Sequence, residues 1–304
     1  MKELKSTLLK KISTVVIFGC VILGIVMAIN VFISQSNNII SMEHRSQWYL
    51  EKIYEDYPNY YRDVVGNKVV KVAVIDSGIY KEHIDLANCN ILSYNVSGID
   101  TENNHDWEHG TMIAGIICGS NSQGNGILGI NPNVKLIMID VSDDSGIKDE
   151  QQIIEGIEYA IENDVDIINM SFTTKKDHKE LKAAIELAQK QGVVIVASAG
   201  NDRDGDITYP ASYEGVIAVG AYAKNGDIMY SMLEKCVYLP GENISTVKAD
   251  DHNIRQYVSR SGTSMATAIY TGILSVIMSR DDTDNIDKLI NMKGKIESIT
   301  QFID

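Results

Sequence analysis

Five runs of apolar, mostly β-branched residues recur along the chain after residue 65, and each has the length of a strand. They are Val69–Ile75, Lys135–Val141, Val165–Met170, Val193–Ala197 and Val216–Ala221. Between them, Gln152–Glu162 and Glu180–Gln191 place apolar residues three and four positions apart, which is typical of amphipathic helices. Continuous apolar strands separated by such helices predict an α/β fold, in which helices cover both faces of a mainly parallel sheet.

A longer apolar run precedes this region. Residues 12–33 contain 22 positions without a charge, and a helix of that length reaches about 33 Å, enough to cross a hydrocarbon core of about 30 Å. The lysines before the run would stay on the cytoplasmic side, so the rest of the chain should face outward. We therefore expect a basic cytoplasmic segment (1–11), a transmembrane helix (12–34), a linker (35–46) and a catalytic domain (47–304), located at the cell membrane.

A cleaved signal peptide is the main alternative to a retained anchor. Val26-Met27-Ala28 loosely fits a small-residue cleavage site, in which case the domain would be secreted. The apolar run continues beyond that point to Ile33, which favours the anchor. A lipoprotein signal at Cys20 fits poorly, because the bulky Phe18 lies where a smaller or β-branched residue is expected.

Charge and cysteine content narrow the classes of function. The chain has 27 basic and 41 acidic side chains, for a net charge of −14. Because phosphate backbones are bound by clustered Lys and Arg, this balance argues against nucleic-acid binding. Four cysteines without a CxxC pair give neither a zinc site nor a disulfide scaffold. At most one bridge could join the three that follow Cys20, and buried free thiols are the simpler interpretation.

Three separate segments carry residues suited to nucleophilic catalysis. Asp76 ends an apolar strand, His109 opens a helix rich in small residues, and Ser264 lies at the start of a long apolar helix. Singly, they could be a turn aspartate, a structural histidine and an N-cap serine. Together they supply a hydroxyl, an imidazole to take its proton, and a carboxylate to orient the imidazole. A fourth segment ends in Asn201, whose amide could donate a hydrogen bond to a developing oxyanion.

These segments resemble the subtilisin family of serine peptidases. Asp76-Ser77-Gly78-Ile79, His109-Gly110-Thr111, Ala197–Asn201 and Ser261–Ala266 follow the family's order and spacing, and the similarity covers residues 47 to about 280. The resemblance implies a subtilisin-like three-layer fold, with Asp76, His109 and Ser264 as the catalytic triad and Asn201 as the oxyanion donor. It also implies that an extended peptide or protein substrate pairs with the strand around Ser171, Phe172 and Thr173, and that a turn with a cis peptide bond precedes Pro210.

The chain departs from the family pattern at several positions. Thr173-Thr174 replace a usual Gly-Gly pair and should reshape the neighbouring subsites. Ala268 and Tyr270 replace a Pro and a His that take no part in proton transfer. Fewer than about 40 residues separate the apolar run from the first strand, so we expect no pro-domain there.

The resemblance also bears on metal binding and specificity. No cofactor is needed for the chemistry, but Gln47, Asp85 and Asn121 resemble positions that hold a structural Ca²⁺, for which the alternative is a polar loop without an ion. Asp202 follows Asn201 at the pocket for the residue before the scissile bond. Its carboxylate would favour Lys or Arg there, unless it is only part of a solvated acidic loop.

The sequence thus predicts a monomeric, membrane-anchored, extracytoplasmic serine endopeptidase. Its narrower role would be the processing of secreted peptides, such as the removal of leaders from bacteriocin precursors. The alternatives are a catalytically silent subtilase that binds peptides and a broadly degradative protease.

Overall fold

The computed structural model describes residues 26–27, 46–54, 65–98, 107–143, 146–147, 149–202, 208–230, 236–250 and 252–302. The chain divides into two compact units, residues 1–44 and 45–304. Of the first unit only Val26 and Met27 are described, both in a helix. The predicted transmembrane helix and linker therefore lie almost wholly outside the described residues. Within those residues, no helix combines the length and the apolar character needed to cross a membrane.

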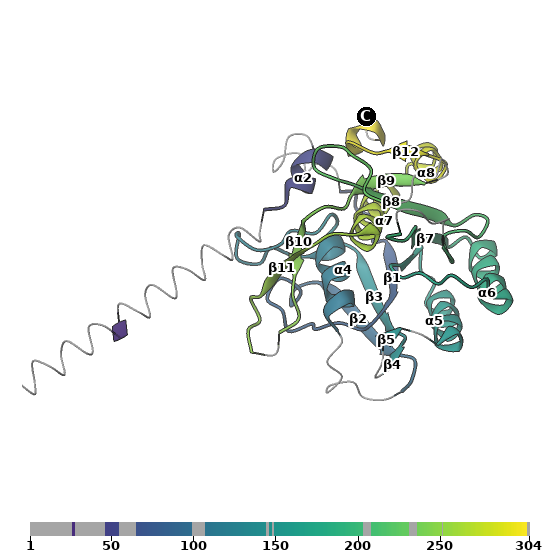
Figure 1. Cartoon of the computed structure of the whole chain (residues 1–304), viewed down its shortest axis with the longest axis horizontal. Helices are drawn as coiled ribbons and strands as arrows, with labels where there is room; N and C mark the ends of the chain where they lie inside the picture. The colour runs from purple at the N-terminus through teal and green to yellow at the C-terminus, as the bar shows by residue number, and fades with distance from the viewer. Residues whose placement is uncertain are drawn as a thin grey trace, which may run out of the picture. The chain divides into compact units, whose positions relative to one another are not determined.

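A parallel sheet forms the centre of the second unit (Figure 1). In the described residues it has eight strands in the order β12-β9-β8-β7-β6-β1-β3-β2, and every neighbouring pair is parallel. These strands are β1 (Lys71–Asp76), β2 (Asn90–Asn95), β3 (Lys135–Asp140), β6 (Ile167–Met170), β7 (Val194–Ser198), β8 (Ile217–Tyr222), β9 (Val237–Pro240) and β12 (Gly294–Lys295). Two antiparallel ribbons pair β4 (Ser142–Asp143) with β5 (Gly146–Ile147) and β10 (Ile244–Val247) with β11 (Tyr257–Arg260).

Helices cover both faces of this sheet, as the sequence predicted (Figure 1). On one face α5 (Glu150–Glu162) packs beside α6 (Lys179–Lys190), and on the other α4 (Glu108–Cys118) packs beside α7 (Thr263–Ser279). The shorter helices are α2 (Trp48–Ile53), α8 (Thr283–Ile290) and the 3-10 helix η1 (Ile299–Phe302). The α/β fold with a mainly parallel sheet is therefore confirmed.

The burial of each element explains why the hydrophobic pattern located it. In β1 and β3 every residue after the first is buried, which is why both strands appear as unbroken apolar runs. In α5 the buried residues are Ile153, Gly156, Ile157 and Ala160, which lie on one face of the helix. The Asp149 side chain caps this helix by accepting from the backbone N–H of Gln151 at 2.9 Å. The edge strand β2 has no such signature because most of its residues are exposed.

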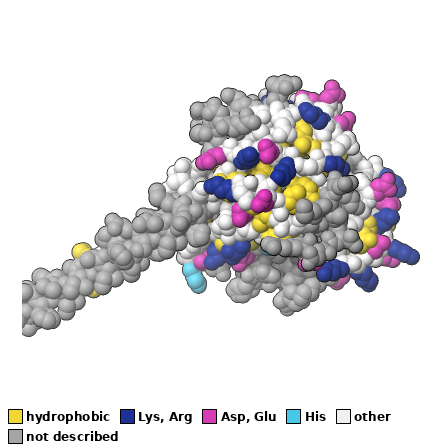
Figure 2. Space-filling model, turned by 45° about the horizontal axis from the view of Figure 1, so that its top comes forward, with side chains coloured by type: hydrophobic (Ala, Val, Ile, Leu, Met, Phe, Trp, Pro, Cys, Tyr) yellow, Lys and Arg dark blue, Asp and Glu magenta, His cyan; other side chains and the backbone are white. Residues whose placement is uncertain are grey.

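Surface charges are mixed on the face of the molecule that Figure 2 shows. Lys and Arg side chains lie among Asp and Glu side chains there, with apolar side chains between them. The described part of this face therefore presents no extended basic strip of the kind that a phosphate backbone requires.

Candidate active site

Asp76 and His109 are in direct contact, although 33 residues separate them in the chain. The imidazole Nδ1 of His109 lies 2.8 and 2.9 Å from the two carboxylate oxygens of Asp76. Asp76 is fully buried at the end of β1, whereas the His109 side chain is 34% exposed. Because an ionised carboxylate can only accept, the proton belongs on Nδ1, and Nε2 is left as the basic atom of a neutral ring.

Small residues bring the first turn of α4 against the turn that follows β1. A Cβ added to Gly110 would lie 2.1 Å from the carbonyl oxygen of Gly78, and Gly78 itself has a positive φ of 84°. The Thr111 hydroxyl accepts from the backbone N–H of Tyr80 at 2.8 Å and ties the same two segments together. The small residues next to His109 thus allow the close approach that the sequence indicated.

Ser264 is the second residue of α7 and not its N-cap, which is Gly262. Its hydroxyl donates to the carbonyl oxygen of Ser171 at 2.8 Å, and the Ser171 hydroxyl donates back to the carbonyl oxygen of Ser264 at 3.3 Å. At this position the free N–H groups and the positive dipole end of α7 favour a negatively charged oxygen. The reading of Ser264 as a mere helix cap is therefore wrong.

Strand register brings these two pairs to the same edge of the sheet. In the pairing of β1 with β6, Ile75 lies opposite Met170, so Asp76, the last residue of β1, and Ser171, the first residue after β6, come next on neighbouring strands. Neighbouring strands are about 4.8 Å apart. The Asp76–His109 pair and the Ser171–Ser264 pair therefore occupy adjacent positions at the carboxyl edge, where parallel sheets collect reactive groups.

Asn201 follows β7, the next strand along the same edge, and is linked to the start of α7. Its Oδ1 accepts from the backbone N–H of Thr263 at 2.9 Å and from the Thr263 hydroxyl at 3.0 Å. These two bonds fix the orientation of the amide, because its oxygen is the acceptor. The Nδ2 group is then the donor that remains for an oxyanion beside Ser264.

A polar network supports the strand that was predicted to bind substrate. Asn169 donates to the Ser171 hydroxyl at 3.0 Å and accepts from the buried Thr271 hydroxyl at 2.9 Å. The Ser198 hydroxyl donates to the carbonyl oxygen of Phe172 at 3.2 Å. Asn169 and Thr271 were missed by sequence reasoning, because neither belongs to a motif and only the packing of β6 on α7 joins them.

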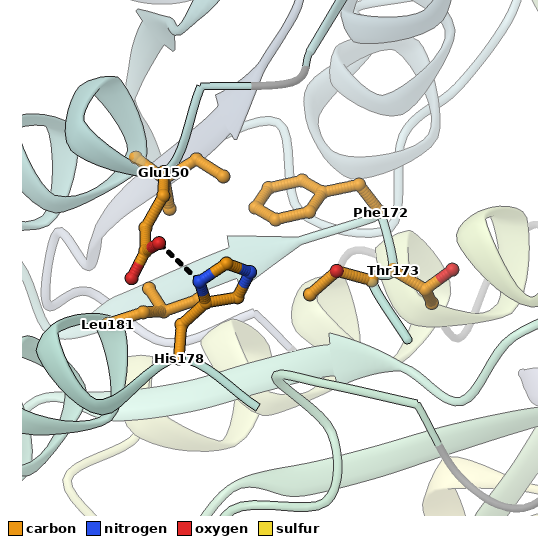
Figure 3. A pocket seen from close by; sticks show the side chains of 7 residues that line it. Glu150, Phe172, Thr173, His178 and Leu181 are labelled. Carbon is orange, nitrogen blue, oxygen red and sulfur yellow. Dashed lines mark ion pairs between the residues drawn. The ribbon is translucent and has the colours of Figure 1, made fainter. Parts of the chain in front are cut away.

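A pocket of about 260 Å³ opens beside this strand (Figure 3). Its walls combine apolar, hydroxyl and charged side chains from β6, α5 and α6 or the segments that adjoin them: Glu150, Ile153, Phe172, Thr173, Thr174, His178 and Leu181. Figure 3 shows Glu150 and His178 joined as an ion pair through His178 Nδ1. No local sequence pattern indicates this pair, because 28 positions separate its members. The prediction that Phe172 and Thr173 adjoin a substrate subsite is consistent with this geometry.

The remaining predicted specificity residue already has a partner. Asp202 pairs with Lys175, with 3.0 Å between Oδ2 and Nζ, and both side chains are largely exposed. Exposed ion pairs of this kind contribute little free energy and are readily exchanged. The carboxylate is therefore available to another cation only in competition with Lys175.

The three predicted calcium ligands use their side-chain oxygens for other contacts. Both carboxylate oxygens of the buried Asp85 accept from backbone N–H groups, those of Ser122 at 3.1 Å and Ile127 at 2.8 Å. Asn121 Oδ1 accepts from the N–H of Gly126 at 2.7 Å. Similarly, Gln47 Oε1 accepts from the N–H of Leu128 at 2.9 Å.

Each of these oxygens already accepts one main-chain hydrogen bond, so fewer of its lone pairs remain for the oxygen cage that Ca²⁺ requires. No cluster of three or more His, Cys, Asp or Glu suited to a metal ion occurs in the described parts of the chain, but the predicted set contains one such residue and is not tested by this. Calcium binding is untested and stays a prediction that these contacts do not support.

One further implied feature is present. The Tyr209–Pro210 peptide bond is cis, in the turn for which the resemblance implied it.

Comparisons with known proteins identify the family of this chain. The model of the subtilase family matches residues 67–294. The chain is 37% identical to the major intracellular serine protease of Bacillus subtilis (strain 168) over 238 residues, which cover 74% of this chain and 73% of that protein. It is 36% identical to subtilisin DY of Bacillus licheniformis over 229 residues, covering 73% and 81%. It is 34% identical to the minor extracellular protease Epr of Bacillus subtilis (strain 168), but the match covers 82% of this chain and only 38% of Epr.

Solved structures give the same result. The prenylagaramide maturation protease PagA superposes with a TM-score of 0.63 at 26% identity, over 73% of this chain and 80% of PagA. The protease domain of PatA, in its S218A mutant, superposes with a TM-score of 0.62 at 24% identity over 72% and 82%, which supports the fold alone. With the family match, the relatives and the Asp76–His109 contact taken together, the chain belongs to the subtilase family of serine peptidases.

Proposed function

We propose that this chain is a membrane-anchored, extracytoplasmic serine endopeptidase that cleaves through an acyl-enzyme. The observation that supports the proposal is the Asp76–His109 contact at the end of β1, together with the bond from Ser264 to Ser171, which follows the neighbouring strand β6. The Asn201 amide oxygen is bonded to Thr263, the residue before Ser264. Ser264 attacks the scissile carbonyl while His109 Nε2 takes its proton, and Asp76 stabilises the imidazolium. Asn201 Nδ2 donates to the oxyanion, and His109 then returns the proton to the leaving amine.

A fluorophosphonate probe tests this chemistry, because it reacts only with an activated serine. We expect the full-length protein and a Ser259→Ala control to be labelled, and the Ser264→Ala variant to remain unlabelled although it is folded. Ser259 is a suitable control because it lies in β11, outside the site. A wild-type protein that folds but takes no label would instead support the silent, peptide-binding alternative.

The narrower role that we propose is the processing of particular secreted peptides, with leader removal from bacteriocin precursors as one example. It is supported by the resemblance to PagA, which is a maturation protease, and by the pocket beside Phe172 and Thr173, which could select a substrate side chain. Mass spectrometry of extracellular peptides from cells with the wild type or Ser264→Ala would reveal the cleavage sites. A few recurrent sites support processing, whereas rapid digestion of unfolded casein supports a degradative enzyme.

A preference for Lys or Arg before the cut is a separate proposal. It rests on the position of Asp202 directly after Asn201 and on the weakness of its exposed contact with Lys175. The test compares kcat/KM for peptides with Arg and Leu at that position, in the wild type and in Asp202→Asn. Equal or lower values for Arg in the wild type would reject the preference.

Membrane anchoring rests on the uncharged run of residues 12–33. Fractionation of cells followed by N-terminal sequencing distinguishes the two alternatives. We expect the protein in the membrane fraction with its N-terminal segment intact. A soluble extracellular protein that begins after Ala28 would establish a cleaved signal peptide instead.

A further inference from the structure

Only one pair among the three described cysteines can meet. Cys236 directly precedes β9 and Cys89 directly precedes β2, and these strands are six positions apart in the sheet. At about 4.8 Å per strand this separation is on the order of 29 Å, far beyond the reach of a disulfide. Cys118 is the last residue of α4, which packs over β1 and β3 near β2.

Cys89 and Cys118 are in contact. The Cys89 thiol donates to the carbonyl oxygen of Cys118, with Sγ 2.8 Å from that oxygen. Cys89 Sγ makes a second contact, at 3.4 Å, with the carbonyl oxygen of Asp85. Cys118 is buried and Cys89 is partly exposed, so an external oxidant reaches the pair from the side of Cys89.

The two thiols differ in their access to solvent. Because Cys89 is partly exposed and Cys118 is buried, Cys89 is the thiol that an external oxidant can reach, and Cys118 is the thiol that resolves the product.

We propose that Cys89 and Cys118 form a disulfide bond in the mature protein. The Cys89 thiolate attacks the disulfide of an external thiol oxidoreductase, and Cys118 then displaces the mixed disulfide. The two cysteines lose two electrons and two protons, and the oxidant gains two thiols. The bond itself depends on the contact described above, while its formation in the cell uses the extracytoplasmic location that belongs to the proposed function.

The bond would fix the last turn of α4, the helix whose first turn carries His109, to the segment that leads into β2. A backbone hydrogen bond already joins the two segments next to these cysteines, because Ser120 donates its N–H to the carbonyl oxygen of Asp85 at 2.8 Å. A covalent closure here removes conformations from the unfolded chain more than it changes the folded one. It therefore acts on the stability of the region that supports His109 and leaves the catalytic atoms in place.

The test oxidises the purified full-length protein with diamide, whose N=N bond accepts two electrons and two protons, followed by alkylation and non-reducing peptide mapping. We expect a cross-linked pair of peptides with Cys89 and Cys118, and two fewer titratable thiols in the wild type and in Cys236→Ser. Cys89→Ser should lose both signals. The proposal is overturned if Cys89 and Cys118 both remain alkylated, or if Cys89 is found linked to Cys20 or Cys236.

Thermal unfolding with and without reductant measures how much the disulfide bond stabilises the folded protein. The bond would close the loop of chain from Cys89 to Cys118. For a loop of that length we expect reduction to lower the Tm of the oxidised wild type and of Cys236→Ser by about 5–10 °C. Cys89→Ser should show no dependence on reductant. An unchanged Tm in a protein whose peptide map shows the bond would overturn the stabilising role. Peptide hydrolysis plays no part in either readout, so a failure of the proposed function leaves both results interpretable.

Discussion

The imidazole of His109 faces both carboxylate oxygens of Asp76, with Nδ1 2.8 and 2.9 Å away from them. One of those oxygens also accepts from the backbone N–H of Ser77 at 2.8 Å, so the carboxylate cannot rotate away from the ring without losing a buried bond. The contact therefore determines which nitrogen of His109 carries the proton and which is left to act as a base.

We expect Asp76→Asn to retain the fold and to lose most of the activity. An amide that donates to Nδ1 would stabilise the wrong tautomer, with the proton on Nε2, and kcat should fall by about 10⁴ at neutral pH. The measurement is steady-state hydrolysis of a peptide substrate, with the Tm as the control for folding. A loss of less than tenfold in a folded variant would show that His109 does not need this partner.

Two substitutions at Asn201 separate its roles as acceptor and donor. Asn201→Asp keeps an oxygen for Thr263 but replaces the donor with an anion, whereas Asn201→Ala removes both. We expect Asn201→Ala to lower kcat by about 10²–10³, the range found for the corresponding asparagine of subtilisin, with a smaller change in KM. Asn201→Asp should lose at least as much with a nearly unchanged Tm. Wild-type kcat in Asn201→Asp would assign the oxyanion contact to another group.

Gly110→Ala tests the close approach of α4 to the turn after β1. The new methyl group would lie 2.1 Å from a backbone oxygen, so α4 must move, and we expect a loss of roughly 2–3 kcal/mol in the free energy of unfolding. The matched control is Gly156→Ala in α5, where the nearest atoms are side-chain methyls at 3.0–3.2 Å and alanine favours the helix by about 1 kcal/mol. Denaturant unfolding should give Gly156→Ala a much higher free energy of unfolding than Gly110→Ala. Equal free energies for the two variants would contradict the close packing of α4 against the turn after β1.

Removal of calcium should leave the protein unchanged. The side-chain oxygens of Gln47, Asp85 and Asn121 already accept from backbone N–H groups. A calcium ion at 1,000 times its Kd would add about 4 kcal/mol of stability, or roughly 10 °C in Tm. We therefore expect the Tm in excess EGTA and in excess calcium to agree within about 2 °C. A shift near the larger value would show that this loop rearranges to bind the ion.

Alkaline pH should destabilise the protein partly through Tyr213. Burial raises the pKa of Tyr213 to about 12, and its hydroxyl donates to the carbonyl oxygen of His178 at 2.9 Å while accepting from the N–H of the same residue at 3.0 Å. The pKa of Tyr213 is therefore higher in the folded protein than its value of about 10 in the unfolded chain. For this reason its contribution to the free energy of unfolding is fully present below about pH 10 and is lost as the pH rises towards 12.

The measurement is the Tm between pH 9 and 12. We expect Tyr213→Phe to begin with a lower Tm and to fall less steeply than the wild type, because it has no proton to lose at this position. The exposed Tyr94, changed to Phe, is the matched control and should follow the wild-type slope. Identical slopes for all three proteins would remove Tyr213 from the explanation.

The sheet and its main helices could be predicted because burial of a strand or helix face determines which positions in that segment are apolar. The strands β1 and β3 are buried on both faces and so are apolar without interruption, and α5 and α6 repeat their apolar residues every three or four positions. Their observed limits differ from the predicted ones by no more than two residues. The edge strand β2 was not predicted, because exposed strands carry few apolar residues and no fixed alternation.

The sequence by itself determined the fold class, the family and the residues able to supply the acid, base and nucleophile, because each of these depends on residue type at a local position. Tertiary structure alone decided which of those atoms meet. It joined Asp76 to His109, turned the oxygens of Asp85 towards backbone donors, and placed Cys89 on Cys118. Contacts of this kind depend on strand register and helix packing between segments far apart in the chain, and no local pattern encodes a distance between them.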